Sequence, residues 1–140
     1  MDIPDINVWL ALVDQNHTHH ASAASYWQDI SETEVAFTRV SMLGLLRLST
    51  MPGVLSRTLS AAEAWDIYRQ LLTGPNHRFL DEPATLEYHF AALTTRAAQP
   101  HRLWTDAYLA AFAIASGCRL VSFDADFSRF AGLNFLRLSA

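Results

Sequence analysis

Three aspartates stand where one expected element of the chain gives way to the next. Asp5 ends the first strand-like run, Asp124 follows the strand-like run of residues 119–123, and Asp106 lies in the first turn of the most apolar helical segment. In an open parallel sheet, ligands bind beyond the carboxyl ends of the strands, so these carboxylates are expected at one edge. Gathered carboxylates repel one another, and a hard divalent cation such as Mg²⁺ relieves that repulsion while keeping several waters. The positions therefore predict a magnesium site.

Each aspartate taken alone also has a purely structural explanation. Asp5 can cap the helix that follows it, and Asp106 is favoured by the dipole of its own helix. Asp124 and Asp126 can shape the turn before Phe127. The hypothesis of a shared site therefore depends on the convergence of the three positions on one sheet edge.

The elements that must position these residues alternate between strand-like and helical patterns. Strands are predicted over Met1–Asp5, Glu34–Thr38, His77–Leu80, Arg119–Phe123 and Asn134–Leu138. Helical patterns cover Val8–Leu12, Ala21–Ile30, Val40–Leu48, Ser60–Leu72, Pro83–Ala98 and Thr105–Ser116. Strands separated by helices form βαβ units. We therefore expect one domain over residues 1–140, with a three-layer α/β/α fold and a mostly parallel central sheet of about four to five strands.

Several helix ends carry local signals. Ser60 and Glu63 have the spacing of a capping box, Thr105 is the expected N-cap of the last long helix, and Gly117 is expected to close it. The tryptophans expected in the core are Trp27, Trp65 and Trp104.

Composition narrows the class of protein. The net charge of −4 argues against bulk electrostatic attraction of nucleic acid, although all ten basic residues are arginines, which grip phosphate bidentately. The single cysteine, Cys118, is expected as a buried thiol. No uncharged run has the length of a membrane span, and the chain does not open like a signal peptide, so a cytoplasmic protein with no membrane contact is expected.

Three segments resemble the motifs of PIN domains in order and spacing across nearly the whole chain. Asp5–Leu10 resembles their opening Asp-x-Asn motif, Trp104–Ala111 their central aspartate helix, and Leu120–Phe127 their last motif. Two further segments, Asn16–His20 and Thr38–Leu48, resemble VapC toxins, the ribonuclease half of toxin–antitoxin pairs. The resemblance implies a PIN fold and metal-dependent cleavage of RNA.

The resemblance also implies a role for each acidic residue. Asp5 and Asp106 would ligate Mg²⁺ or Mn²⁺, and Asp124 would complete the cluster directly or through water. The metal would lower the pKa of a bound water for in-line attack on a phosphodiester. Asp126 is a lesser candidate for the same cluster.

Neighbouring polar residues are expected to support the site. Carboxylate orientation is a suitable task for Asn7, Thr38 and Ser122, each close to a strand end. Arg39 and Arg47 are candidates for contact with RNA phosphates, although Arg47 can equally pair with an aspartate.

The partners follow from the same resemblance. They are an RNA substrate, with tRNA and rRNA as candidates, and a VapB-like antitoxin held in an apolar groove. A homodimer is expected as well, because the segment Ser41–Met51 is more apolar than one small domain readily buries.

One departure from the PIN pattern concerns the metal site. PIN domains usually carry a glutamate on the helix after the second strand, and Gly44 stands at that place here. Glu82 could compensate by reaching the site through water, and the alternative is a surface acid in the turn before Pro83. If it does not, a catalytically weakened PIN-like module that binds RNA or a partner is the alternative.

Two other readings of the sequence are weaker. An aspartate-based phosphotransferase of the haloacid-dehalogenase type would need a second acid where Asn7 stands, and a lysine, which the chain lacks. His17, His19 and His20 are near one another, but no cysteine or carboxylate pattern accompanies them, so they are expected at a solvated helix start.

Overall fold

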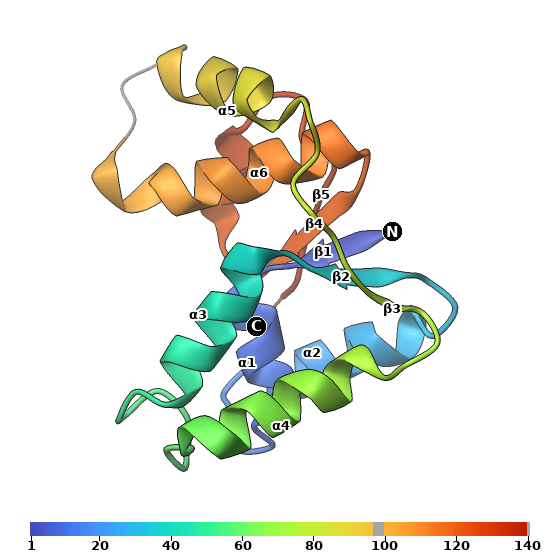
Figure 1. Ribbon diagram of the computed structural model, residues 1–140, viewed down its shortest axis with the longest axis vertical. Helices are drawn as coiled ribbons and strands as arrows, with labels where there is room; N and C mark the ends of the chain where they lie inside the picture. The colour runs from blue at the N-terminus through green and yellow to red at the C-terminus, as the bar shows by residue number, and fades with distance from the viewer. Residues whose placement is uncertain (97–99, 140) are drawn as a thin grey trace.

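The computed structural model describes residues 1–96 and 100–139, which form one sheet covered by helices (Figure 1). Its strands are β1 (Asp2–Pro4), β2 (Val35–Phe37), β3 (His77–Phe79), β4 (Arg119–Ser122) and β5 (Phe135–Arg137). Its α-helices are α1 (Ile6–Val13), α2 (His20–Asp29), α3 (Arg39–Ser49), α4 (Ala61–Leu72), α5 (Leu86–Thr95) and α6 (Trp104–Ser116). There are two 3₁₀ turns: η1 (His101–Leu103) directly precedes α6, and η2 (Ala125–Arg129) follows β4.

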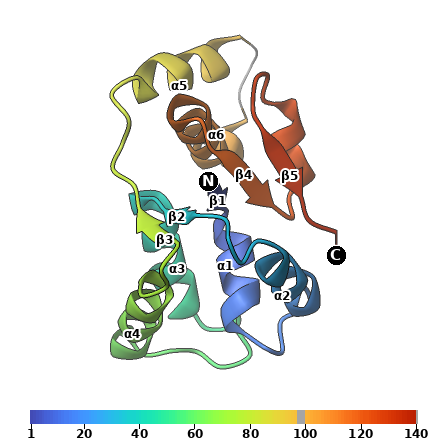
Figure 2. The ribbon, with the colours of Figure 1, turned by 90° about the vertical axis from the view of Figure 1, so that its right-hand side faces the viewer.

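The sheet is fully parallel, with the order β3-β2-β1-β4-β5. This arrangement places the first strand at the centre and the strand after α6 beside it, so segments far apart in sequence meet in the middle of the sheet (Figure 2). The predicted α/β class and the mostly parallel sheet are confirmed, and all five predicted strands are present.

The two faces of the sheet are covered by different helices. Ile3 and Leu120 pack with α5 and α6 in one core, whereas Phe37 and Val121 belong to the opposite side, with α1 to α4 (Figure 1). Side chains alternate between the faces of a strand, so strands buried on both sides read as continuous apolar runs. The three-layer α/β/α architecture is confirmed. In the described residues no helix is both long and apolar enough to cross a membrane.

An aromatic cluster packs α1 and α4 against β2 of the sheet. The ring of Trp9 on α1 stacks on that of Phe37 with centroids 4.0 Å apart, and Tyr68 of α4 meets the same phenyl ring edge-on at 5.0 Å. The prediction of core tryptophans was wrong for Trp65 and Trp104, which remain 40% and 45% exposed on helix surfaces.

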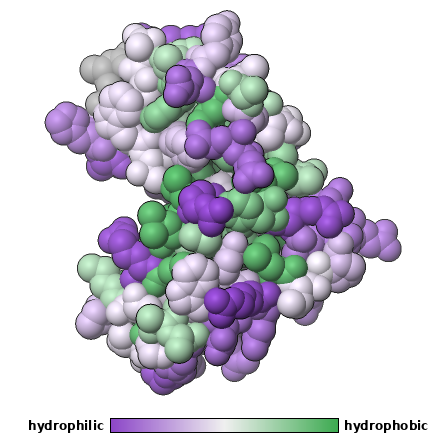
Figure 3. All heavy atoms as spheres, viewed as in Figure 1, coloured by the Kyte–Doolittle hydropathy of each residue, from purple (hydrophilic) through white to green (hydrophobic). Residues whose placement is uncertain are grey.

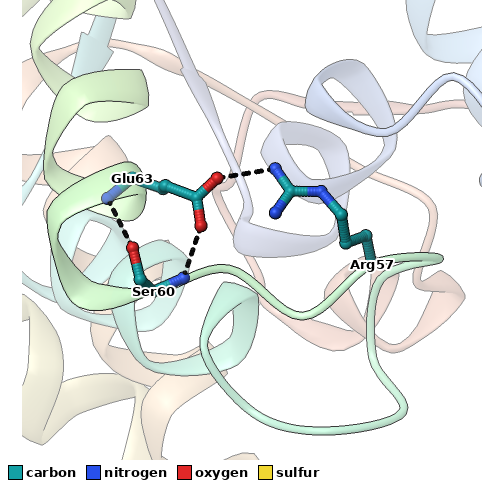
Figure 4. A network of polar contacts seen from close by, with 3 residues as sticks. All are labelled: Arg57, Ser60 and Glu63. Carbon is teal, nitrogen blue, oxygen red and sulfur yellow. Dashed lines mark hydrogen bonds and ion pairs between the residues drawn. The ribbon is translucent and has the colours of Figure 1, made fainter.

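The helix ends confirm some local predictions and correct others. Ser60 and Glu63 form the predicted capping box, and Arg57 binds the Glu63 carboxylate from outside (Figure 4). Gly117 ends α6 with a φ of 68°, in the left-handed region where glycine is free of strain. The thiol of Cys118 is buried as predicted.

Two predicted helix starts were wrong. Thr105 is not an N-cap, because the 3₁₀ turn η1 runs directly into α6 and makes Leu103 the residue before the helix. Pro83 does not begin a helix, because residues 83–85 form a turn that delivers the chain to Leu86. The predicted end of that helix at Ala98 lies outside the described residues.

A partly buried ion pair joins β1 and β4 at the start of both strands. Arg119 of β4 binds the Asp2 carboxylate of β1 through Nε at 3.0 Å and Nη2 at 2.8 Å. The hydroxyl of Tyr26 on α2 donates to the same carboxylate at 2.8 Å. The Asp2 side chain is only 3% exposed, so its charge depends on these partners.

Asp2→Ala should therefore destabilise the protein by about 2–4 kcal/mol, because it leaves the Tyr26 hydroxyl buried without an acceptor and the Arg119 charge unpaired. Chemical denaturation measures the loss. Arg57→Ala is the control: it breaks the exposed Arg57–Glu63 pair and should leave the denaturation midpoint unchanged. Equal midpoints for both variants would contradict the assigned role of Asp2.

Candidate active site

The ends of β1 and β4 bring the first motif against the last. Asp5 directly follows β1, and its backbone N–H donates to the Val121 carbonyl oxygen of β4 at 2.8 Å. Its carboxylate accepts from the backbone N–H of Ile6 at 2.7 Å and so caps α1. The other carboxylate oxygen accepts from the Ser122 hydroxyl at 2.8 Å. Asp5 therefore serves as a helix cap and as part of a polar site at the sheet edge.

The Ser122 hydroxyl is fully buried and binds three other residues. It donates to Asp5 and accepts from the Asn7 side-chain amide at 3.1 Å and from the backbone N–H of Asp124 at 3.0 Å. The Asn7 carbonyl oxygen in turn accepts from the backbone N–H of Phe123 at 3.4 Å. A hydroxyl has one proton and two lone pairs, so these three bonds saturate Ser122.

Asp124 is held by the turn that follows it. Its carboxylate accepts from the backbone N–H of Asp126 at 2.8 Å and caps η2. The turn-forming role considered for this residue is thus real. The turn holds Asp124 next to Ser122, whose hydroxyl accepts from the Asp124 backbone N–H and donates to Asp5.

Asp106 completes the cluster from α6. Burial is the main cause that raises its pKa to about 7, and the negative charges of Asp5, Asp124 and Asp126 contribute to the rise in that order. The pKa of Asp5 is raised too, first by burial and then by Asp124, although bonds from Ser122 and Ile6 oppose the rise. The three predicted aspartates therefore lie within range of one another's charge, and Asp5 and Asp124 are also linked through their shared hydrogen-bond partner Ser122.

One residue of this edge was missed in the sequence. Arg102, in η1, donates through Nη1 to an Asp126 oxygen at 2.8 Å, and its charge lowers the pKa of Asp106. Arg102 lies four residues before Asp106 in the sequence, which was the one indication of its proximity. The sequence pattern did not indicate that a 3₁₀ turn leads directly into α6. Asp126 therefore contributes to the cluster with its charge and also holds a cation beside it.

Three other predicted residues lie apart from the carboxylates. The Thr38 hydroxyl takes part in the capping box of α3 with Ser41, so Thr38 is engaged there rather than on an aspartate. The guanidinium of Arg39 lies over the Phe79 ring, 4.4 Å from its centroid. Arg47 is exposed and lines an apolar cavity of about 420 Å³ with Thr105, the neighbour of Asp106.

At Gly44, where PIN domains usually carry a glutamate, the Ile6 side chain occupies the space next to the backbone. A Cβ atom at Gly44 would lie 2.1 Å from Cδ1 of Ile6, so α3 and α1 approach closely where the glutamate is usual. Glu82 is exposed. Its negative charge contributes to the raised pKa of Tyr108 and is not among the causes that shift the pKa of Asp5 or Asp106. These contacts give no support for compensation by Glu82.

The donor set agrees with a hard divalent cation. Carboxylate and hydroxyl oxygens surround the edge, and the raised pKa values of Asp5 and Asp106 mark negative charge in need of compensation. In residues 1–96 and 100–139, no three His, Cys, Asp or Glu side chains are close enough to hold one ion together. Mg²⁺ is usually bound by one or two carboxylates, with water in the other positions, so a magnesium site does not require three carboxylates on one ion.

Comparisons with known proteins agree with this geometry. The family described as PIN domain matches residues 3–133. Ribonuclease VapC41 of Mycobacterium tuberculosis is 37% identical over 97% of both chains. Among solved structures, VapBC2 from Rickettsia felis bound to a promoter DNA fragment has a TM-score of 0.74 at 14% identity, covering 99% of this chain and 98% of that one. Mycobacterium tuberculosis VapC20, a sarcin-ricin loop cleaving toxin, has a TM-score of 0.69 at 18% identity, covering 95% and 98%.

The pKa of Asp106 predicts how the metal-free protein responds to pH. A carboxyl whose pKa is higher in the folded state stabilises the fold when protonated, and that contribution is lost as the pH rises from about 4 to about 7. Asparagine imitates the protonated acid at every pH. In EDTA, Asp106→Asn should therefore melt above wild type, with a margin that widens between pH 5 and pH 8 by on the order of 5 °C.

Thermal melts of both proteins at the two pH values measure this margin. Asp66→Asn, whose side chain is 72% exposed on α4, is the matched control and should follow wild type at both. A margin for Asp106→Asn that stays constant with pH would show that the carboxyl does not titrate in this range.

Proposed function

The chain belongs to the PIN-domain family, and within it to the VapC ribonucleases; on that premise we propose that it is a Mg²⁺-dependent endoribonuclease. Residues 1–140 would form a single PIN domain acting as the toxin of a toxin–antitoxin pair. The observation that carries the proposal is the meeting of Asp5 and Asp124 on the buried Ser122 hydroxyl at one sheet edge, with Asp106 within range of their charge.

The proposed catalytic and metal-binding residues are Asp5, Asp106 and Asp124, with Mn²⁺ as an alternative ion. When bound, the metal would supply a water of lowered pKa as the nucleophile and offset charge on the phosphodiester. Ser122 fixes the orientation of the Asp5 carboxylate by donating to one of its oxygens. Asn7 holds Ser122 in place from α1.

The arginine held by Asp126 gives this edge a cation of its own. Arg102 is 69% exposed and lies within reach of the charges of Asp106 and Asp124. A phosphodiester approaching the carboxylates brings negative charge into a negative site. A guanidinium tethered at the rim offsets part of that repulsion without entering the cluster.

The partners extend the proposal. Because the structural neighbour VapC20 is a toxin that cleaves the sarcin-ricin loop, structured RNA of the rRNA or tRNA class is the proposed substrate, in the cytoplasm. The VapBC complexes favour a VapB-like antitoxin. Its peptide would fit the cavity of about 470 Å³ between α1, α2 and α4, which is lined mostly by apolar side chains such as Leu12, Trp27 and Ile67.

A homodimer is proposed through α3 and the α5–α6 layer. The exposed fractions of Leu43, Trp104 and Tyr88 are 58%, 45% and 75%, and the first two line the cavity shared with Arg47. Figure 3 shows hydrophobic residues in the middle of the face that it draws, between the α5–α6 layer and the helices α3 and α4. A second copy would remove this surface from water.

Cleavage of total RNA by the pure protein in Mg²⁺, Mn²⁺ or EDTA tests the activity, with the cut ends mapped. Asp5→Asn, Asp106→Asn and Asp124→Asn should each reduce cleavage by about a hundredfold or more while the protein stays folded, because each removes an anionic oxygen at the metal. Mg²⁺ should raise the melting temperature of wild type more than that of the variants.

Asp66→Asn is again the matched control and should change neither property. Wild-type protein that binds RNA without cutting it in either metal would favour the weakened binding module that Gly44 left open. Full activity in any of the three variants would refute the shared site.

Leu43→Glu should convert the proposed dimer to a monomer, because it places a charge in the apolar contact. Light scattering at micromolar concentration measures the mass. Trp65→Glu on α4 also adds a charge at an exposed apolar position and should leave the dimer intact. A monomeric wild type without any partner would count against the dimer.

A further inference from the structure

A second cavity opens beside the acidic edge on the side of β5. It has a volume of about 350 Å³ and is lined by His19, Phe123, Arg137, Leu138 and Ser139. Phe123 lies between Ser122 and Asp124 in the chain, so one wall of the cavity is continuous with the proposed active site. The same His19, Arg137, Leu138 and Ser139 also line a groove of about 700 Å³ along α2. We call the two together the α2–β5 trough, and Figure 2 shows α2 and β5 on the same side of the molecule.

Arg137 gives this trough an unengaged cation. It is the last residue of β5 and lies in register with Ser122 of β4, one strand away from the hydroxyl that binds Asp5. Within the described residues Arg137 is exposed and forms no ion pair. Arg119, which also lines the groove, is bound to Asp2, and Asp29 is the carboxylate lining its α2 side.

The imidazole ring of His19, which lines the same trough, can donate a hydrogen bond. Its ring stacks on Phe123 with centroids 4.7 Å apart, and its Nδ1 is buried with no hydrogen-bond partner. The neutral imidazole has one N–H and one acceptor nitrogen, and a phosphate oxygen at Nε2 would select the tautomer that carries its proton there. By contrast, Nδ1 of His17 and Nδ1 of His20 are both engaged with backbone groups.

The start of α2 adds further donors. His19 is its N-cap residue and makes no side-chain capping bond. The His20 amide donates to the His17 carbonyl oxygen at 3.0 Å, so the amides of Ala21 and Ser22 are the ones left for another acceptor. Thr18, Ser22 and Ser25 place hydroxyls along the groove. A guanidinium, an imidazole N–H, free amides and hydroxyls form a set rich in donors, which suits phosphate oxygens.

We propose that the α2–β5 trough binds the RNA backbone next to the scissile bond, with a phosphate on Arg137 and His19. This inference rests on the proposed function, since it takes the RNA strand to leave the carboxylate cluster past Phe123. A local phosphate site would also let the protein bind RNA despite its net charge of −4, without long-range attraction between the whole protein and RNA.

Binding of a fluorescent single-stranded RNA in EDTA tests the trough separately from cleavage. Arg137→Gln should weaken binding about five- to tenfold and reduce the slope of log K against log salt by about 0.7, the value for one phosphate contact on a single strand. In Mg²⁺ it should raise KM with little change in kcat, because a remote contact is equal in ground and transition states. His19→Phe keeps the stack on Phe123, removes the donor, and should also weaken binding several-fold.

Arg69→Gln makes the same change of charge on α4, away from the trough, and should behave as wild type in both assays. If wild type cleaves RNA but Arg137→Gln matches Arg69→Gln in salt slope and KM, the trough proposal is overturned and the proposed function stands. If wild type binds RNA through Arg137 but never cleaves it, the proposed function fails and the trough stands. A poly-glutamate peptide that binds with Arg137 dependence while RNA does not would overturn the trough as an RNA site.

Discussion

The buried hydroxyl of Ser122 is the contact on which the geometry of the acidic edge depends. It binds a carboxylate from the end of β1, an amide from α1 and a backbone N–H from the turn after β4. Because β1 and β4 are neighbours in a parallel sheet, segments 117 residues apart reach one oxygen. A hydroxyl can satisfy one acceptor and two donors at once, whereas alanine would leave Asp5 without this partner and free Asn7 and Asp124 to move.

The remaining architecture supplies the charge balance around that hydroxyl. Asp5 and Asp106 are both held where burial and like charges raise the pKa, which costs stability in the absence of a cation. At the opposite end of the same strands, Asp2 is fully paired with Arg119 and Tyr26. The two central strands are thus fastened by a satisfied charge at one end and carry unsatisfied charge at the other, an arrangement that favours ion binding at the second end.

Much of the fold and part of the site could be predicted from the sequence. Apolar runs and their spacing gave the five strands, and the rule that polar residues follow strand ends located Asp5, Ser122 and Asp124. Asp106 could be predicted because its apolar helix had to start at the same edge.

The features that were not predicted depend on local geometry. The turn η1, which made Thr105 an interior residue of the helix, also placed Arg102 beside Asp126. Thr38 satisfied the strand-end rule equally well, but Ser41 three residues on drew its hydroxyl into a cap. The exposure of Trp104 is a property of the helix face, which composition does not define.

The distribution of arginines explains how an acidic protein can bind RNA as proposed. Half of the ten arginines are tied to carboxylates: Arg57, Arg69, Arg78, Arg102 and Arg119. Arg39 lies over a phenyl ring. Of the arginines without such partners in the described residues, Arg47 lines the cavity at the proposed dimer contact, and Arg137 lines the trough beside Phe123. Screening limits the reach of surface charge to about 10 Å at moderate salt, so local placement outweighs the sum over the chain. A phosphodiester strand that passes the proposed carboxylate cluster would therefore meet Arg102 beside the carboxylates and Arg137 in the trough beyond Phe123.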